Sequence, residues 1–267
     1  MSKTFALIGA GGYIAPKHIE AIKANGCDLI EIVDVNDSVG IIDRYFPNCK
    51  FSNKLTTKPD YVSICTPNFL HYDHIKEAIA KGCNVICEKP VVLYSHQIDQ
   101  LKALANLKGV SVNCILQLRL NPMVELLKEY ASLSNGNKIE VTYHTPRGDW
   151  YAKSWKGDVN KSGGKLFNIG IHLFDLLTHI WGDVYDVSDG IIYFRKSIAY
   201  YSLSTSFEDA KEPVREFKVD GMVLDLTKGF TDAHTLSYER ILEGKGFDIT
   251  EAKKSIELIE RINESVH

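Results

Sequence analysis

The chain has 267 residues, a hydrophobic share of 45% and a formal net charge of -3. The near-balanced charge excludes the basic surface of a protein that binds nucleic acid or an anionic membrane. No apolar run approaches the ~20 residues that span a bilayer, and the first residues do not resemble a signal peptide, so we expect a cytoplasmic protein. The six cysteines form no Cys-x-x-Cys pair, which favours reduced thiols in the core.

A glycine-rich turn follows the first apolar run, Phe5 to Ile8, and leads into an amphipathic helix. Gly9 permits a tight turn and Gly11 lets the backbone approach a pyrophosphate, while the start of the helix attracts its charge. Ile14 replaces the third glycine of the dinucleotide fingerprint, so the turn alone is a weak signal. Its context strengthens it, because the next strand ends in Asp34, where an acid binds the ribose diol of NAD. The alternative is an ordinary turn between a strand and a helix.

Strands are expected next at 29–34, 61–65, 84–87 and 111–116, with helices at 71–81 and 95–107. This alternation predicts a parallel, doubly wound Rossmann sheet over residues 1–120. Ligands bind beyond the carboxyl ends of such strands. The polar, Gly or Pro residues that follow the strands are Gly9 to Gly12, Asp34, Thr66, Pro67, Asn68, Glu88, Lys89, Pro90, Gln117 and Arg119. Of these, Lys89 is the least ordinary, since a lysine at a buried strand end needs a partner or a role.

The pattern changes after about residue 120, which predicts a second, α+β domain over 121–267 with a mainly antiparallel sheet. Its expected strands are 138–145, 186–194, 198–207, 214–219 and 222–226, and its expected helices are 167–181, 234–243 and 250–265. Asp220-Gly221 predicts a tight hairpin. Strands such as 191–194 alternate too little to leave one face wet, so we expect this sheet to form the interface of a homo-oligomer, a dimer or a tetramer.

The expected helix 167–181 carries one polar stripe in an otherwise apolar sequence. The stripe contains Asn168, His172, Asp175 and His179, at helical spacing. Three hypotheses compete for it: a satisfied structural seam, a metal site on His172, Asp175 and His179, and a catalytic histidine that faces the cofactor. We favour the catalytic histidine and predict no metal.

Residues 145–165 combine five basic residues with two acidic ones and with aromatic side chains. Cations bind phosphate or carboxylate, and aromatic faces cover a sugar or base ring. The segment therefore predicts an anion site, with a solvated basic loop as the alternative. Its candidate residues are Arg147, Trp150, Tyr151, Lys153, Trp155 and Lys156.

The remaining histidines have simpler explanations. His18, His71 and His74 lie on expected helices of the first domain and are interpreted as structural. His234 and Tyr238 lie one turn apart on a helix that Thr231 or Asp232 would cap, and a substrate role for them stays open.

The chain resembles the glucose–fructose oxidoreductase and inositol dehydrogenase family over essentially its whole length. The markers are the turn Gly9 to Ile14, Thr66-Pro67-Asn68 with His71, Glu88-Lys89-Pro90, and the run Gly164 to Asp175 with Gly170-Ile171-His172. A narrower resemblance, to the UDP-N-acetylglucosaminuronate 3-dehydrogenase branch of that family, rests on three segments: 9–18, 147–157 and 229–234.

The resemblance implies oxidation of the sugar 3-hydroxyl with tightly held NAD, in bacterial surface-polysaccharide (O-antigen) synthesis, and return of the hydride to 2-oxoglutarate. It implies Lys89 and His172 as the catalytic pair. His172 would take the hydroxyl proton, and Lys89 would stabilise the developing alkoxide beside the nicotinamide. The aspartate that is frequent one turn before the histidine is Asn168 here.

Strand ends and resemblance together assign two sets of ligand contacts. The NAD contacts are Gly9, Gly11, Gly12, Tyr13, Ile14, Asp34, Thr66, Pro67, Asn68, His71, Glu88, Lys89 and Gln117. The UDP-sugar contacts are Lys89, Arg119, Arg147, Tyr151, Lys153, Trp155, Lys156, Asn168 and His172. Two alternatives stay open: another sugar or sugar-phosphate dehydrogenase of the same fold, and a non-catalytic NAD-binding regulator.

Overall fold

The computed structural model describes residues 2–36, 40–226 and 232–265. Contacts divide the chain into two compact units. The first unit comprises the residues up to Val92, His96–Gln117 and Asp232–Ala252. The second comprises Leu93–Ser95, Leu118–Thr231 and Lys253–His267. In the described ranges, no helix is long and apolar enough to cross a membrane.

The first unit is built on a seven-stranded sheet of order β13-β6-β5-β4-β1-β2-β3. Its parallel strands are β1 (Thr4–Ile8), β2 (Asp28–Val33), β3 (Lys50–Ser52), β4 (Tyr61–Ile64), β5 (Asn84–Cys87) and β6 (Val112–Cys114). The chain starts at the centre, runs to one edge and returns to build the other side, which is the predicted doubly wound topology.

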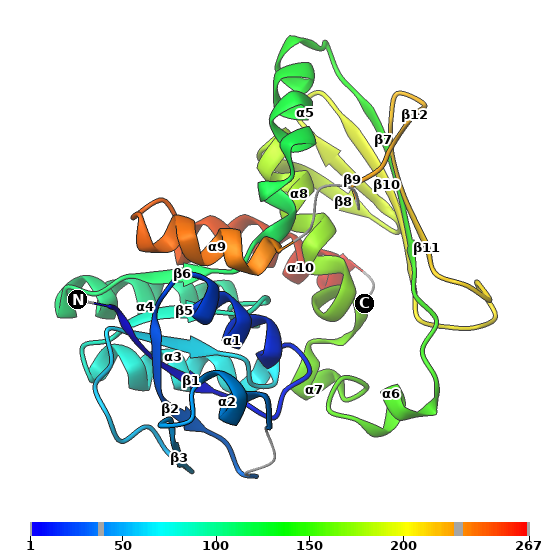
Figure 1. Cartoon of the computed structure of the whole chain (residues 1–267). Coiled ribbons are helices and arrows are strands. Elements are labelled where there is room, and N and C mark those ends of the chain that lie inside the picture. The colour runs from blue at the N-terminus through cyan, green and yellow to red at the C-terminus, as the bar shows by residue number, and fades with distance from the viewer. Residues whose placement is uncertain (1, 37–39, 227–231, 266–267) are drawn as a thin grey trace. The chain divides into compact units, whose positions relative to one another are not determined.

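Helices cover both faces of this sheet because its strands are apolar on both sides (Figure 1). Helices α1 (Ala15–Ala24), α2 (Gly40–Tyr45) and α9 (Ala233–Leu242) contribute to a core that includes Phe5, Leu7 and Ile86. The other helices of the unit are α3 (His71–Ala80), which packs on β4 and β5, α4 (Ser95–Lys108) and the 3-10 turn η1 (Asn68–Leu70). All six cysteines are free; five are buried and Cys49 is half-buried.

The C-terminal part of the chain returns to the first unit, which differs from the predicted division at residue 120. Helix α9 packs on α1, and β13 (Phe247–Asp248) pairs antiparallel with the edge strand β6. The 3-10 turn η4 (Ile249–Ala252) follows. The side chain of Tyr238 on α9 is fully buried in the core of this unit. Pairing partners more than a hundred residues apart carry no local sequence signal, so this return was not predicted.

The second unit contains a six-stranded sheet of order β12-β11-β7-β10-β9-β8. Its strands are β7 (Lys138–His144), β8 (Val184–Ser188), β9 (Ile191–Phe194), β10 (Ile198–Ser204), β11 (Val214–Val219) and β12 (Met222–Leu224). All pairs are antiparallel except β7 with β10, which confirms the predicted mainly antiparallel sheet. The Asp220-Gly221 hairpin is present, with positive φ angles of 51° and 82°.

Helices of the second unit are α5 (Pro122–Leu133), α6 (Asp149–Lys153), α7 (Val159–Ser162), α8 (Ile171–Trp181) and α10 (Lys253–Ser265), with the 3-10 turn η2 (Gln117–Leu120) at its start. The expected helix 167–181 begins instead with a π-helical segment, η3 (Leu166–Gly170). The wider π turn changes the angle between successive side chains, so the polar stripe follows α-helical spacing only from Ile171 onward.

Candidate functional site

The glycine-rich turn of the first unit has the close packing that a dinucleotide cradle requires. Gly9 has a φ of 88°, and a Cβ atom there would come within 2.8 Å of the backbone at Cys65. A Cβ on Gly12 would come within 2.9 Å of the Cys65 carbonyl oxygen. Only glycine fits at both places, and the turn leads directly into α1, which begins at Ala15. The residues present therefore fit a bound dinucleotide.

Asp34 lies against this turn. Its Oδ2 accepts a hydrogen bond from the Gly11 amide at 2.8 Å, and its Oδ1 accepts one from the Val35 amide at 2.6 Å. A carboxylate beside the middle glycine of the turn is placed to bind the ribose diol of an adenosine.

Further predicted cofactor residues follow β4, β5 and β6, which are strands on the opposite side of β1 from β2 (Figure 1). Thr66 and Asn68 follow β4, Glu88 and Lys89 follow β5, and Gln117 follows β6. Because these strands are parallel neighbours, their carboxyl ends share one edge of the sheet. The structure thus brings this predicted set together within one unit.

His71 has an internal role in the structure. Its ring is buried, with Nδ1 at 2.7 Å from the Pro90 carbonyl oxygen and Nε2 at 2.8 Å from the Thr66 carbonyl oxygen. Burial lowers the pKa of His71, although both carbonyl groups favour protonation. Through these two contacts the ring connects the loop after β4 with the loop after β5. Direct contact of His71 with a cofactor stays a prediction.

Glu88 is the centre of a buried polar cluster that the sequence did not predict. Its Oε1 lies 2.9 Å from the Nε2 atom of His18 on α1 and 2.9 Å from the Nε2 atom of His234 on α9. Its Oε2 accepts a hydrogen bond from the Lys89 amide at 3.1 Å. The Gln117 side-chain amide lies 3.1 Å from His234 Nε2. We call Glu88, His18 and His234 the Glu88 cluster.

Hydrogen bonds continue from this cluster to Tyr238 and Ser63. Burial lowers the pKa of His18 and raises that of Tyr238 well above its ordinary value. A neutral His18 donates from Nε2 to Glu88 and accepts at Nδ1 from the Tyr238 hydroxyl, 2.7 Å away. The Tyr238 oxygen in turn accepts from Ser63, at 2.6 Å. Five buried side chains from distant parts of the chain are therefore satisfied by one another.

The charge of Glu88 is stabilised by this arrangement. Burial alone would raise the pKa of Glu88, but the hydrogen bonds and charges of His18 and His234 outweigh it and hold the pKa well below its usual range. Glu88 is only 5% exposed. An ionised carboxylate is thus fixed next to Lys89, at the end of β5.

The ligand atoms of the Glu88 cluster lie within 4.8 Å of one another, which is also a spacing that metal ions accept. Among the described residues, it is the group of His, Cys, Asp or Glu side chains whose ligand atoms lie this close together. The expected alternative on α8, with His172, Asp175 and His179, does not have it. The distances to Glu88 are those of hydrogen bonds, and the absence of a metal stays a prediction.

The basic segment of the second unit gathers cations around Trp150. The Arg147 guanidinium carbon lies 5.9 Å from the centre of its ring, and Lys156 Nζ lies 5.8 Å from the same centre. Burial and the charge of Arg147 lower the pKa of Lys156. Among the described residues, Arg147 Nε is one of two buried side-chain polar atoms without a hydrogen-bond partner. Two neighbouring cations and an unsatisfied donor are features of an anion site.

Asn168 links this basic segment to the π-helical turn before α8. Its side-chain amide donates to the Tyr151 hydroxyl at 3.1 Å and to the Lys156 carbonyl oxygen at 2.9 Å. The predicted substrate residues Tyr151, Lys156 and Asn168 are therefore in contact. Lys153 is exposed, while Trp155 and His172 are half-buried.

Arg119 is used inside the second unit. Its guanidinium donates to Asp175 through Nε at 2.9 Å and through Nη2 at 2.7 Å, and both side chains are buried. Burial and the positive charges of Arg119 and Lys128 lower the pKa of His179 to about 4. Asp175 and His179, two of the four residues of the polar stripe, are thus close to charged side chains of the second unit. Contact between Arg119 and a substrate stays a prediction.

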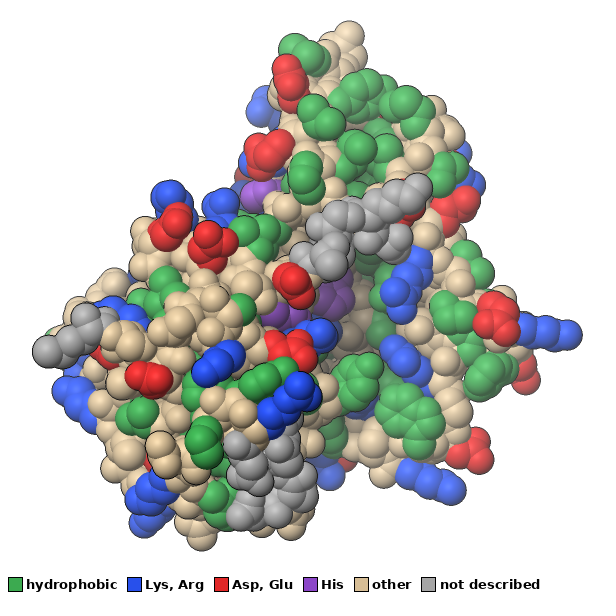
Figure 2. All heavy atoms as spheres, in the orientation of Figure 1, with side chains coloured by type: hydrophobic (Ala, Val, Ile, Leu, Met, Phe, Trp, Pro, Cys, Tyr) green, Lys and Arg blue, Asp and Glu red, His purple; other side chains and the backbone are tan. Residues whose placement is uncertain are grey.

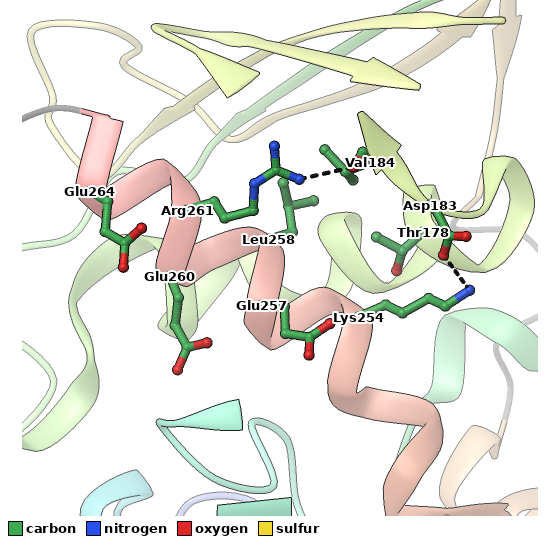
Figure 3. Close-up of a pocket in the computed structure, with 9 residues that line it drawn as sticks. All are labelled: Thr178, Asp183, Val184, Lys254, Glu257, Leu258, Glu260, Arg261 and Glu264. Carbon is green, nitrogen blue, oxygen red and sulfur yellow. Dashed lines mark hydrogen bonds and ion pairs between the residues drawn. The ribbon is translucent and has the colours of Figure 1, made fainter. Parts of the chain in front are cut away.

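A hollow of about 350 Å³ lies between α8, β8 and α10, and it contains none of the predicted site residues (Figure 3). Both of its basic side chains have protein partners. Lys254 pairs with Asp183 at 2.7 Å, and Arg261 donates to the carbonyl oxygens of Val184 and Tyr185. We therefore assign no ligand to it.

Comparison with known proteins gives matches in both parts of the chain. Residues 3–115 match the oxidoreductase family with an NAD-binding Rossmann fold, and residues 136–197 match the C-terminal alpha/beta domain of the same family. Glucose-6-phosphate 3-dehydrogenase of Bacillus subtilis is 26% identical over 189 residues, which are 67% of this chain and 54% of that protein. The chain spans about half the length of the curated relatives that it matches.

Two solved structures of the WlbA (WbpB) dehydrogenase from Thermus thermophilus are similar over nearly the whole chain. One, in complex with NAD and alpha-ketoglutarate, has a TM-score of 0.89 and 36% identity, covering 96% of this chain and 93% of that chain. The other, in complex with NAD and UDP-GlcNAcA, has a TM-score of 0.88 and 35% identity, covering 97% and 94%.

Proposed function

Because this chain belongs to the oxidoreductase family that joins an NAD-binding Rossmann fold to a C-terminal alpha/beta domain, as its motifs predicted, and NAD is its cofactor, we propose that it oxidises a UDP-sugar. The proposed substrate is UDP-N-acetylglucosaminuronic acid, and the proposed product is its 3-keto form. The likeness to the Thermus enzyme in complex with UDP-GlcNAcA supports this substrate.

The observation that carries the substrate class is the cation pair at Trp150. A UDP-sugar acid offers a diphosphate, a carboxylate and ring faces. The buried, unsatisfied Nε of Arg147 and the neighbouring Lys156 suit the anionic groups, and the exposed Trp150 ring suits a ring face. A neutral free sugar offers no anionic group to these two cations.

The proposed roles at the reacting carbon belong to Lys89 and His172. Oxidation of a secondary alcohol removes the hydroxyl proton while hydride leaves the carbon, so a base with a near-neutral pKa is needed, and His172 fills that role. The ammonium of Lys89 stabilises the developing alkoxide. Bound NAD supplies the hydride acceptor.

The proposal also includes the biological setting of the reaction. The Thermus complex with alpha-ketoglutarate supports 2-oxoglutarate as the acceptor that reoxidises the cofactor. The branch resemblance supports a role in bacterial surface-polysaccharide (O-antigen) synthesis. Six free cysteines suit a reducing compartment such as the cytoplasm.

We also propose that the second unit forms a homo-oligomer, a dimer or a tetramer. Figure 2 shows hydrophobic side chains gathered at the top of the view, over α5 and the strands of this unit. Exposed apolar residues of these elements include Leu126, Leu133, Tyr200, Met222 and Val223. Such clusters commonly mark association. Light scattering at micromolar concentration should give a multiple of 30.0 kDa, and a monomer mass would contradict the proposal.

The proposed reaction is tested by mixing the purified protein with NAD and UDP-N-acetylglucosaminuronic acid and following the absorbance of reduced nicotinamide. Where cofactor is tightly held, 2-oxoglutarate should be converted to 2-hydroxyglutarate instead. Glucose 6-phosphate is the comparison substrate, because the relative from Bacillus subtilis is a glucose-6-phosphate 3-dehydrogenase. Turnover of glucose 6-phosphate alone would favour the sugar-phosphate alternative. A protein that holds NAD and turns over neither would favour a regulator.

A further inference from the structure

The Glu88 cluster lies on the side of the sheet where the nicotinamide half of the cofactor is expected. The glycine turn after β1 receives the pyrophosphate, and Asp34 after β2 receives the adenosine ribose. The remaining half of the dinucleotide then extends to the other side of β1, where β4, β5 and β6 end. Glu88 is the residue that follows β5.

At a pH above the range in which free imidazoles are protonated, the cluster holds a negative charge that its imidazole and amide donors do not cancel. Two imidazole Nε2 atoms at 2.9 Å and the Lys89 amide at 3.1 Å surround the carboxylate. Neutral imidazoles and an amide donate hydrogen bonds but carry no formal charge. Because the group is 5% exposed, water screens its charge less than it screens a surface carboxylate.

We propose that the Glu88 carboxylate is a fixed negative charge that makes this protein bind NAD+ more tightly than NADH. The nicotinamide ring is positively charged when oxidised and neutral when reduced, so a buried anion on its side of the sheet stabilises only the oxidised form. The inference depends on the NAD cofactor and not on the identity of the sugar, so it can fail while the proposed reaction stands.

The test is competition of NADH against NAD+ on the full chain, followed by the fluorescence of bound NADH. Work at about pH 8.5 keeps free imidazoles neutral, and EDTA excludes metal from the cluster. The quantity measured is the ratio of the NADH to the NAD+ dissociation constant. Glu88→Gln should lower this ratio about tenfold, while Glu88→Asp, which keeps the charge, should leave it within about twofold.

The matched control is Glu31→Gln. Glu31 is also a buried carboxylate of this sheet, held by hydroxyl and amide donors, but it lies on β2, on the adenosine side. In Glu31→Gln, the ratio of the NADH to the NAD+ dissociation constant should stay within about twofold of its value in the unaltered protein. An unchanged ratio in folded Glu88→Gln, or an equal change in Glu31→Gln, would overturn the proposal.

If Glu88→Gln does not fold, a second variant tests the effect of the Glu88 charge. Gln117→Lys leaves the carboxylate in place and puts an ammonium where the Gln117 amide now lies, 3.1 Å from His234 Nε2. By offsetting the negative charge it should lower the ratio in the same direction, by about threefold or more. A ratio that does not fall in this variant would overturn the proposal.

Discussion

Asp34 accepts a hydrogen bond from the backbone amide of Gly11 at 2.8 Å, so the acid that ends the second strand and the middle of the glycine turn form one structural feature. The two residues are 23 positions apart in the sequence, and their hydrogen bond shows that this spacing brings the acid against the glycine turn. It also places a negative charge where NADP would bring its 2′-phosphate.

From this contact we predict a preference for NAD over NADP that Asp34 causes. Asp34→Ser should weaken NAD binding by about tenfold, since a hydrogen bond to a charged group contributes roughly 1.5 to 3 kcal/mol, and should narrow the difference between the cofactors. Direct titration with both cofactors measures this. Asp28→Ser, at the exposed start of the same strand, is the control. Equal affinity of the unaltered protein for NAD and NADP would refute the prediction.

Glu31 should stabilise the fold in a pH-dependent way. Burial alone would raise its pKa, but hydrogen bonds from Ser52, Thr56 and Thr57 lower it to about 2. Because the folded pKa lies below the unfolded one, the contribution is complete above the unfolded value and is lost as the pH falls toward the folded value. At pH 7 it amounts to on the order of 3 kcal/mol.

Chemical denaturation of Glu31→Gln measures this contribution. At neutral pH the variant should lose free energy of unfolding on that order, and the difference from the unaltered protein should shrink toward pH 2. Glu77→Gln, an exposed carboxylate on α3, should change little at either pH. A difference for Glu31→Gln that does not depend on pH would show that its charge is not responsible.

The buried pair of Arg119 and Asp175 should be structural. Arg119→Met leaves Asp175 without its partner and should cost about 3 to 5 kcal/mol of unfolding free energy, whereas Arg119→Met with Asp175→Leu should recover most of it. Thermal and chemical unfolding decide this. A stable Arg119→Met protein with a raised Michaelis constant for the UDP-sugar would instead support the substrate contact first predicted for Arg119.

The cations near Trp150 should bind the anionic part of the substrate. Arg147→Ala and Lys156→Ala should each raise the Michaelis constant for the UDP-sugar about tenfold or more, because each removes a charge-assisted contact. Lys161→Ala is the matched control, since Lys161 lies in the same segment, is exposed and pairs with Asp158 at 3.3 Å. If Arg147→Ala and Lys156→Ala both leave the kinetics unchanged, the segment is a solvated basic loop.

Much of the fold was predictable because it is encoded locally. Apolar runs, the glycine turn and the residues at strand ends lie within short windows, and they identified the doubly wound sheet and the cofactor edge. The return of α9 and β13 to the first unit was not predictable, because pairing of β13 with β6 depends on residues far apart in the chain. The π-helical turn before α8 has no simple pattern either.

In the site, too, residues with a local sequence signal were predictable and contacts between distant residues were not. Glu88 and Lys89 stood out because they follow a buried strand, and Asp34 because of its distance from the turn. The sequence favours a structural role for His18 and leaves a substrate role for His234 open, yet both contact Glu88, from positions 70 and 146 residues away. The one available signal was His234 and Tyr238 one turn apart on a helix. Their burial with His18 accounts for that spacing. Of the two expected capping residues, Asp232 makes no side-chain capping hydrogen bond, and Thr231 lies outside the described residues.

The catalytic roles predict a characteristic pattern of losses. Lys89→Ala and His172→Asn should each keep the fold and NAD binding while turnover falls by about 10² to 10⁴. Because both residues are proposed to act on one proton transfer, the double variant should be far less than multiplicatively worse. Near-normal turnover in a folded His172→Asn protein would move the base elsewhere.

The most direct test of the proposed reaction uses UDP-N-acetylglucosaminuronic acid with deuterium in place of hydrogen on carbon 3 of the sugar. Mass spectrometry of the reduced cofactor, or of the 2-hydroxyglutarate formed from 2-oxoglutarate, reads out the fate of the label. Transfer of deuterium from carbon 3, and none from a sugar labelled at carbon 4, is the result we predict. Reduced cofactor or 2-hydroxyglutarate without deuterium from the carbon 3 label, or formation of neither product, would contradict the assignment.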